Sequence, residues 1–305
     1  MGTRNGLRDV LQLLPRVRHA FAYGSAVHLQ PGLYAPERAQ QQLVDFIMAV
    51  DDTDAWHKQN IERNRSHYSC LAAFGPRAVL FNADQIGAGV HFNTAIPWGK
   101  QKPVLELQQD AQVSSALQQN LKSALTASLL MLPPSFSREE LFSTIVGLSY
   151  LGDIRMGFAE DSRKVQRIVA GSFQGLQRMY IPLMQGFKGL AVSVKATSMS
   201  PLWHQDMQPE CRLHLLSRLP AGVLRGLGTA QGMQLPDTLD RMAIAERVIE
   251  RGREGRAVRS AIARIVRASS RQQALAGLLM AGIPASVRYL WQKMSKAWHP
   301  AGTIR

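Results

Sequence analysis

The hydrophobic pattern changes from short apolar runs to helical periodicity about a third of the way along the chain. Residues 20–23 and 43–50 are short apolar segments followed by turn-forming or acidic residues, a pattern that predicts buried strands. Residues 77–95 predict one or two further strands around two glycines. Residues 7–19 and 56–68 have the spacing of short helices. The N-terminal third therefore has an α/β pattern.

From Val113 onward the apolar residues recur at helical spacing, and this first stripe ends at the prolines 133–134. Ser137 and Glu140 then have the spacing of a capping box, in which each side chain bonds to the other residue's backbone N–H at a helix start. Another helix is expected to begin at Lys164. The middle of the chain is therefore predicted to be mainly helical.

The C-terminal third combines arginines with apolar residues at helical spacing. Residues 241–271 are rich in arginine and poor in acids, and Val258, Ile262, Ile265 and Val266 form an apolar stripe between the arginines. Residues 287–298 add a second stripe with tryptophans and nearby basic residues. A helix that lies in a membrane interface has these features. A solvated basic helix that packs on its own domain explains the pattern equally well.

Composition narrows the class of protein. A chain of 305 residues with 46% apolar and 19% charged residues is globular and long enough for two domains. The net charge of +14 predicts a polyanionic partner, which is nucleic acid, anionic lipid or nucleotide phosphate. Cys70 and Cys211 lie too far apart for a disulfide framework or a zinc motif. No apolar stretch is long enough to span a bilayer, and no cleavable presequence is predicted.

Two elements in the first fifty residues predict nucleotide chemistry. Tyr23, Gly24 and Ser25 directly follow a strand, and glycine lets backbone N–H groups and a hydroxyl approach a triphosphate. Asp45 lies inside the next apolar strand, where a carboxylate needs a partner or a metal. This order opens the nucleotidyltransferase fold, in which the Asp holds Mg²⁺. An ordinary turn and a hydrogen-bonded Asp are the alternatives. Ile47 stands where a second acid is common, so another Mg²⁺ ligand must come from elsewhere.

Seven longer motifs resemble one family in their order along the chain. The chain is similar to the mitochondrial-type CDP-diacylglycerol synthases, also called phosphatidate cytidylyltransferases or the translocator assembly and maintenance family. The motifs are FAYGSAV (21–27), VDFIMAVDD (44–52), AWHKQNIERNRSHYS (55–69), GAGVHFN (87–93), NLKSALTASLLMLP (120–133), LFSTIVGLSYLGDIRMGFAEDSRKVQRIV (141–169) and RSAIARIVRASSRQQALAGLLMAG (259–282).

The resemblance implies a fold and a reaction. Residues 1–108 are expected to form an incomplete α/β nucleotidyltransferase-like domain, 109–190 a mainly helical winged-helix-like domain, and 191–305 a basic amphipathic, membrane-contacting region. The implied reaction transfers a cytidylyl group from CTP to phosphatidate, giving CDP-diacylglycerol and pyrophosphate for phosphatidylglycerol and cardiolipin synthesis, with Mg²⁺ as cofactor. The implied place is the matrix side of the mitochondrial inner membrane, as a peripheral protein on its anionic surface.

The resemblance also carries over candidate site residues. Asp45 is the expected catalytic residue and Mg²⁺ ligand, and the residues expected at CTP are Tyr23, Gly24, Ser25, Lys122, Asp153 and Arg155. Glu160 and Asp161 are candidates for closing the pocket. Alternatively, Lys122 is a solvated helix residue and Asp153 forms a local ion pair with Arg155. His57 and His67 are expected to be core or surface histidines. The expected membrane contacts are Arg256, Arg259, Arg264, Arg267, Arg271, Trp291 and Trp298.

The sequence departs from the family pattern near residues 99–102. There the chain runs directly into Lys102-Pro103-Val104, and a strand and most of a helix of the family are absent. A lost interior strand leaves unpaired backbone groups, so a catalytically impaired splice or gene-model variant is an alternative. Ala26 and Ala276 are smaller departures. A basic nucleic-acid-binding protein is the remaining alternative, and the low aromatic content of 7% speaks against it.

Overall fold

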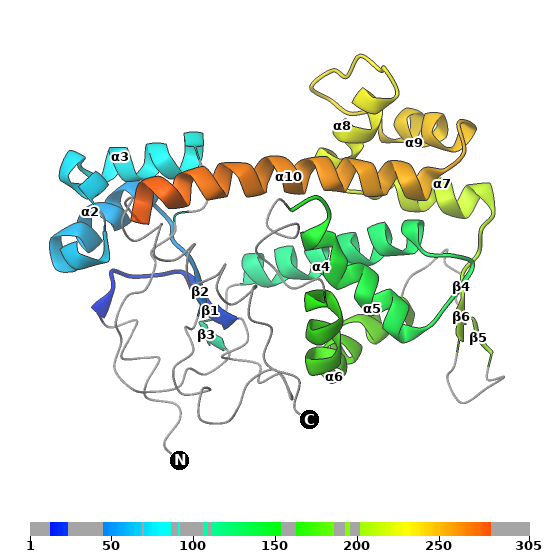
Figure 1. Cartoon of the computed structure of the whole chain (residues 1–305), viewed down its shortest axis with the longest axis horizontal. Helices are drawn as coiled ribbons and strands as arrows, with labels where there is room; N and C mark the ends of the chain where they lie inside the picture. Colours follow the sequence, from blue (N-terminus) through cyan, green and yellow to red (C-terminus); the bar gives the residue numbers. More distant parts are fainter. Residues whose placement is uncertain are drawn as a thin grey trace, which may run out of the picture. The chain divides into compact units, whose positions relative to one another are not determined.

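The computed structural model describes residues 13–23, 45–68, 70–86, 91, 106–108, 111–153, 163–185, 193–195 and 202–281 (Figure 1). These residues group into two compact units. Unit 1 holds the described residues up to Ser114 and those from Ser269 onward, and unit 2 holds those from Ser115 to Ala268. These two units are defined by contacts between residues and do not test the three domains expected from the sequence, which stay a prediction.

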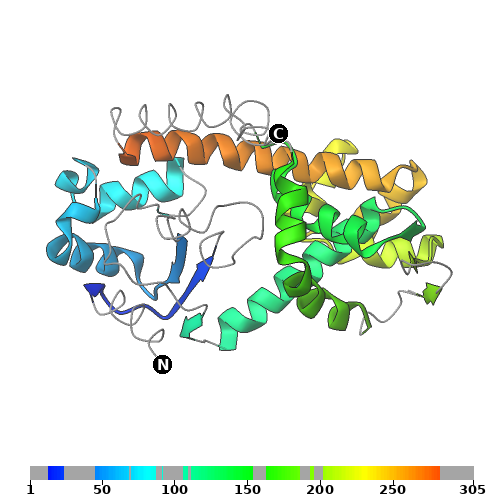
Figure 2. The same cartoon turned by 60° about the horizontal axis from the view of Figure 1, so that its bottom comes forward.

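Unit 1 is built on a three-stranded antiparallel sheet. Its strands are β1 (His19–Tyr23), β2 (Asp45–Ala49) and β3 (Glu106–Gln108), in the order β2-β1-β3. Figure 2 shows the two blue strands β1 and β2 side by side. Both strands predicted in the first fifty residues are therefore confirmed. The expected burial of β2 is wrong in part, since Ile47 is 46% exposed.

Two short helices of unit 1 lie between β2 and β3 in the sequence. They are α2 (Thr53–Arg63) and α3 (Pro76–Phe81), with shorter helical turns η2 (Arg65–His67), η3 (Cys70–Phe74) and η4 (Asn82–Ile86) around them. The side chain of Asp52 caps α2 by accepting from the backbone N–H of Ala55. The helix predicted over 56–68 is confirmed over most of its length.

Two sequence predictions for unit 1 are wrong. Residues 77–86 are helical and do not form strands. Their apolar run is too short to separate the two states by periodicity, and Pro76 at the first helical position fixes a helix start. Residues 14–18 are not helical, contrary to the helix predicted over 7–19, and the part before residue 13 lies outside the described residues.

Unit 2 is mainly helical, with one small sheet. The described helices are α4 (Ala111–Met131, whose first four residues belong to unit 1), α5 (Arg138–Gly147), η5 (Leu148–Tyr150), α6 (Lys164–Gln185), α7 (Pro209–Ser217), α8 (Ala221–Ala230), α9 (Arg241–Glu250) and α10 (Glu254–Ala281, in unit 2 up to Ala268). The antiparallel strands β4 (Ser135–Phe136), β6 (Leu202–His204) and β5 (Ser193–Lys195) lie in that spatial order (Figure 1).

The predicted helices of the middle region are confirmed. The capping box is present at the start of α5, where Ser137 Oγ accepts from the N–H of Glu140 at 3.1 Å. The carboxylate of Glu140 accepts from the N–H of Ser137 at 2.7 Å. Both local signals act within four residues, so no tertiary contact was needed to predict them. Among the described residues, no helix combines the length and the apolar character that crossing a bilayer requires.

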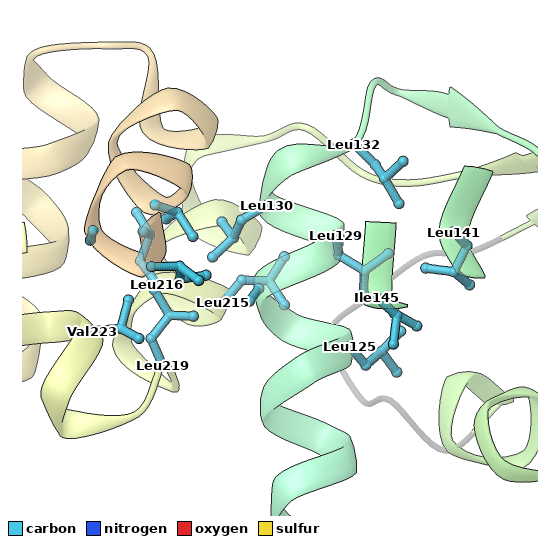
Figure 3. Packing of buried hydrophobic residues seen from close by; sticks show 14 of the residues in the cluster. Leu125, Leu129, Leu130, Leu132, Leu141, Ile145, Leu215, Leu216, Leu219 and Val223 are labelled. Atoms are coloured by element: carbon cyan, nitrogen blue, oxygen red, sulfur yellow. The ribbon is translucent and has the colours of Figure 1, made fainter. Parts of the chain in front are cut away.

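The core of unit 2 forms around two faces of α4 (Figure 3). On one side, Leu129 points toward Leu141 and Ile145 of α5. On the opposite side, Leu130 points toward the leucines of α7, including Leu216. These leucines are at most 1% exposed, and each fully buried leucine stabilises the fold by about 2 kcal/mol. Because α4 is buried on both sides, it is the central helix of unit 2.

A buried arginine joins three helices of unit 2. Arg212 of α7 is 4% exposed and donates to the carbonyl oxygens of Leu129 and Leu130, at 3.2 and 2.6 Å. These carbonyls lie in the last turn of α4, where helical carbonyls have no intrahelical partner. Arg212 also forms an ion pair with Glu254 at the start of α10, at 3.1 Å. One side chain therefore caps α4 and holds the start of α10.

Candidate functional site

The strand ladder of unit 1 brings together two of the predicted site residues. Tyr23 is the last residue of β1, and its Cα pairs with that of Asp45, the first residue of β2. Directly opposed residues in an antiparallel pair lie about 5 Å apart between their Cα atoms. The chain therefore enters the Gly24-Ser25 sequence from a position opposite Asp45. Gly24 and Ser25 themselves, and the side chains of Tyr23 and Asp45, lie outside what the structure describes.

The other carboxylates that follow β2 already have structural partners. Asp51 forms an ion pair with Arg18 at 3.2 Å, and Asp52 caps α2. Within the described part of the chain, no group of three His, Cys, Asp or Glu side chains is arranged to hold a metal ion. Mg²⁺ needs only one or two protein carboxylates when substrate phosphates supply the other ligands. One carboxylate in the position of Asp45 is compatible with that requirement, and among the described residues no second carboxylate joins it.

The residues that follow β2 in the sequence form a buried polar network. The hydroxyl oxygen of Tyr68 accepts from the Asn60 side-chain amide at 2.9 Å and lies 2.8 Å from His57 Nδ1. His57 and Asn60 are three positions apart on α2, so their side chains share one face of that helix. All three residues are at most 7% exposed. The network is satisfied when the Tyr68 hydroxyl donates to His57 Nδ1, which leaves the ring proton on Nε2.

This environment keeps His57 neutral. Burial and, to a smaller extent, the nearby His91 lower its pKa to about 4. The rings of His57 and His91 have centroids 4.5 Å apart in an edge-to-face arrangement, and Tyr68 stacks on His91 at 5.6 Å. Burial also raises the pKa of Tyr68 to about 12, so its hydroxyl keeps its proton. The motifs at 55–69 and 87–93 therefore meet in one polar cluster.

Sequence reasoning found only part of this cluster. It expected His57 to be a core or surface histidine, and the histidine is indeed buried. It missed the hydrogen bond to Tyr68 and the contact with His91. The available signal was that His57 and Asn60 occupy one face of a predicted helix. The partners of that face lie in other segments, which spacing alone does not place.

The candidates from the middle of the chain lie in different environments. Lys122 is exposed on α4, which agrees with the solvated alternative. Asp153 is 6% exposed and follows Gly152, whose φ of +74° is a conformation that favours glycine. A Cβ at position 152 would lie 2.6 Å from the carbonyl oxygen of Ala263 on α10. The turn before Asp153 therefore packs directly on a helix backbone. Arg155, Glu160 and Asp161 lie outside the described residues.

The arginines predicted to contact a membrane share the exposed side of α10. Arg256, Arg259, Arg264, Arg267 and Arg271 are all exposed, while Val258, Ala261 and Ile262 of the same helix are buried. Ile265, expected in the apolar stripe, is 42% exposed. Trp291 and Trp298 lie outside the described residues.

Two of these arginines also contact other parts of unit 2. Arg264 donates to the carbonyl oxygen of Gly226 in α8 at 2.8 Å. Arg259 lines a cavity of about 200 Å³ together with Ser143 and Thr144 of α5. Arg264 is therefore held against α8 and is less able than its neighbours to reach a separate surface.

A family profile and the sequences of three known proteins all point to one family. The sequence profile of a family described as mitochondrial phosphatidate cytidylyltransferase matches residues 7–101 and 99–296. The bovine protein named mitochondrial phosphatidate cytidylyltransferase is 34% identical over 328 aligned positions, covering 95% of this chain and 94% of the bovine protein. The Xenopus laevis protein of the same name is 35% identical over 327 positions, covering 97% and 95%. The Caenorhabditis elegans protein of that name is 31% identical over 321 positions, covering 95% and 97%.

The same comparisons bear on the predicted internal gap. The two profile matches meet at residues 99–101, where the sequence departs from the family pattern. The bovine alignment has 328 positions, whereas 95% of 305 residues is about 290. About 38 aligned positions, the difference between these numbers, therefore have no residue of this chain opposite them. Both observations support the prediction that an internal segment is absent.

Proposed function

This chain belongs to the family of mitochondrial phosphatidate cytidylyltransferases, and we propose that it carries out this transfer at the sheet edge formed by Tyr23 and Asp45. A phosphate oxygen of phosphatidate attacks the α-phosphorus of CTP. A new P–O–P linkage forms in CDP-diacylglycerol, and the bond to the leaving pyrophosphate breaks. The observation that carries the proposed site is the ladder pair between Tyr23 and Asp45.

The protein's part in this reaction is positioning and charge stabilisation. The backbone N–H groups and the hydroxyl of the Gly24-Ser25 sequence would hold the triphosphate, because glycine lets the backbone approach closely. Asp45 would hold Mg²⁺, which when bound neutralises charge on the phosphates. Such groups accelerate the reaction by favouring the in-line geometry and the charge of the transition state. Lys122, Asp153 and Arg155 remain proposed as further CTP contacts.

The polar cluster of His57 and Tyr68 supports the site by fixing the first helix after β2. Because His57 is neutral, the cluster adds no positive charge that would compete with the Mg²⁺ proposed at Asp45. Its hydrogen bonds join residues 57, 60 and 68 into one rigid unit. We assign these residues a positioning role and no direct part in the transfer.

The order of elements supports the winged-helix-like description of the middle region. The elements α4, β4, α5, α6, β5 and β6 follow one another along the chain, and the strands pair in the order β4-β6-β5. A short strand between helices that pairs with a later hairpin is the arrangement that this description requires. The nucleotidyltransferase-like description of the N-terminal domain is supported by the β1–β2 ladder.

The location proposed for the protein is the matrix side of the mitochondrial inner membrane, as a peripheral protein. Two-chain lipids such as phosphatidate stay in the bilayer, because each buried methylene contributes about 0.8 kcal/mol. The exposed arginines of α10 supply attraction to anionic headgroups, at about 1 kcal/mol each before screening. Trp291 and Trp298 are proposed to insert shallowly. Removing residues 286–305 should then weaken sedimentation with cardiolipin-containing vesicles more than it lowers the melting temperature.

The reverse result of the truncation would contradict this contact. If the shortened protein melts at a much lower temperature and still sediments with the vesicles as the full chain does, residues 286–305 belong to a folded core and not to a membrane contact. CTP binding serves as the control, because the truncation removes no residue proposed at the nucleotide.

The reaction itself is tested with the chain and with a version in which the internal segment is restored. Each is incubated with CTP, Mg²⁺ and phosphatidate, and formation of CDP-diacylglycerol is measured. We expect product from the restored chain and less or none from the present chain, because a missing interior strand leaves backbone groups of the sheet unpaired. A restored, folded chain that makes no product would show that the assignment is wrong.

A further inference from the structure

An open hollow of about 370 Å³ lies where α8, α9 and α10 meet in unit 2. Its charged lining residues are Arg251, Arg253 and Arg256, and Gln231 and Ser260 add polar groups. No carboxylate lines it. Three guanidinium groups around one hollow create a local positive potential, which attracts anions.

The nearest carboxylates in the sequence are paired with other arginines. Glu250 forms an ion pair with Arg247 at 3.3 Å, and Glu254 forms one with the buried Arg212 at 3.1 Å. Among the described residues, no ion pair involves any of the three arginines of the hollow. Their charges are therefore compensated only by solvent, and a bound anion would relieve their mutual repulsion.

The backbone at the hollow is strained in a way that a smaller residue would relieve. Arg253 has a φ of +70°, and it is the one non-glycine residue with positive φ in the described part of the chain. Arginine in this conformation is unfavourable, because its Cβ crowds the backbone. Glycine would avoid that strain, yet the position carries a guanidinium group that lines the hollow. Strain of this kind is concentrated at binding sites.

The Gln231 side-chain oxygen, from a residue that lines this hollow, is buried and has no hydrogen-bond partner among the described residues. It is an acceptor, so it would pair with a hydroxyl donor of a ligand and not with an ionised phosphate oxygen. Arg251 donates to the Gln231 carbonyl oxygen at 3.5 Å, which holds its guanidinium at the rim. The N-terminus of α10 and the C-termini of α8 and α9 lie at this hollow, so the positive end of one helix dipole offsets only one of two negative ends. The full charges of the three arginines outweigh the remaining negative charge of about half a unit, so the hollow stays positive.

We propose that this hollow binds a phosphate monoester group. Guanidinium groups match the geometry of phosphate oxygens and form charge-assisted hydrogen bonds to them. The headgroup of a phosphatidate-type lipid and a free phosphate compound present the same chemistry. None of the residues of this hollow is assigned to CTP. With phosphatidate as the ligand the proposal rests on the proposed transfer, which takes that lipid as its substrate; with a free phosphate compound it goes beyond that reaction. It shares only Arg256 with the proposed membrane contact.

The test uses the full chain and three single substitutions, Arg253→Gly and Arg256→Gln at the hollow and one control elsewhere in unit 2. Arg253→Gly removes one guanidinium group and the backbone strain together, so loss of binding cannot be ascribed to unfolding if the melting temperature does not fall. Arg178→Gln is the control, because it removes the same charge from an exposed position on α6, in the same unit and outside the hollow. Binding of inorganic phosphate and glycerol 3-phosphate is followed by the NMR signals of the arginine Nε–H groups.

A second arm measures sedimentation with phosphatidylcholine vesicles, with and without phosphatidate. We expect Arg253→Gly to weaken glycerol 3-phosphate binding about tenfold, as loss of one charge-assisted hydrogen bond does. We expect it to weaken partition onto phosphatidate vesicles about fivefold. Arg178→Gln should change neither by more than about twofold. If only the soluble arm responds, the site holds, and a free phosphate compound is its ligand.

Two results would overturn the proposal. In the first, Arg253→Gly and Arg256→Gln both bind glycerol 3-phosphate and phosphatidate vesicles as the unchanged chain does. In the second, both substitutions abolish binding to a DNA duplex while neither phosphate monoesters nor vesicles bind the unchanged chain. All readouts are binding measurements without CTP, so they stand or fall independently of turnover.

Discussion

The buried His57 predicts how the stability of unit 1 depends on pH. Its pKa in the folded chain is about 4, against about 6.5 in the unfolded chain. Between these values the unfolded chain binds more protons at this residue, so stability falls as the pH falls. At pH 5 His57 is mostly protonated in the unfolded chain and hardly protonated in the folded chain. From pH 7 to pH 5 the folded state should therefore lose about 2 kcal/mol from His57 alone.

The loss is measured by hydrogen exchange of the amides of α2, which carries His57. The opening free energy of these amides, corrected for intrinsic exchange rates, is compared at pH 7 and pH 5 in the unchanged chain and in His57→Gln. Glutamine does not titrate, so the variant should lose about 2 kcal/mol less than the unchanged chain. His67 is present in both proteins, so its own pH dependence cancels in the comparison. Equal pH dependence in the two proteins would refute the argument that His57 is held neutral.

Three further substitutions test the packing of unit 2 by calorimetric melting. Gly152→Ala should cost about 2 kcal/mol or more, because it forces a residue with a Cβ into positive φ, 2.6 Å from a carbonyl oxygen of α10; an unchanged melting temperature would contradict this. Arg212→Met should lower the free energy of unfolding by about 3 kcal/mol or more, because it removes the cap of α4 and leaves Glu254 unpaired. The control is Arg218→Met, an exposed arginine directly after α7, which should lower it by less than about 1 kcal/mol. Ser137→Ala should cost about 1 kcal/mol through the lost helix cap, and a neutral result would show that the capping box does not stabilise α5.

Local signals made much of the fold predictable. The capping box at Ser137 and the helical stripes from 113 and 164 depend on neighbours within one or two turns, and each appears as predicted. The two strands that contain Tyr23 and Asp45 were predicted from short apolar runs with flanking turn signals. The same rule gave a wrong prediction for residues 77–86, because an apolar run of this length is compatible with a helix as well as with a strand.

The sequence predicted parts of the site and not how they meet. The two strands that carry Tyr23 and Asp45 were predicted, but the antiparallel pairing that sets these residues opposite each other comes from the structure. The contact of His57 with His91 joins segments more than thirty positions apart, and no spacing rule predicts it. The hollow at Arg253 depends on the backbone angle of that residue and on three helix ends. The composition shows that the chain is basic, but it does not show which arginines lie together in the fold.

The central claim is that Asp45 carries the transfer of the cytidylyl group, and a matched pair of substitutions tests it most directly. In the chain with the internal segment restored, Asp45→Asn and Asp51→Asn remove the same charge at the two ends of one segment. Asp51 is exposed and pairs with Arg18, so its loss should change turnover by less than about threefold. Asp45→Asn should lower kcat for CDP-diacylglycerol formation by about 100-fold or more, with the melting temperature unchanged. A folded Asp45→Asn protein that keeps turnover within about threefold of the unchanged enzyme would contradict the account.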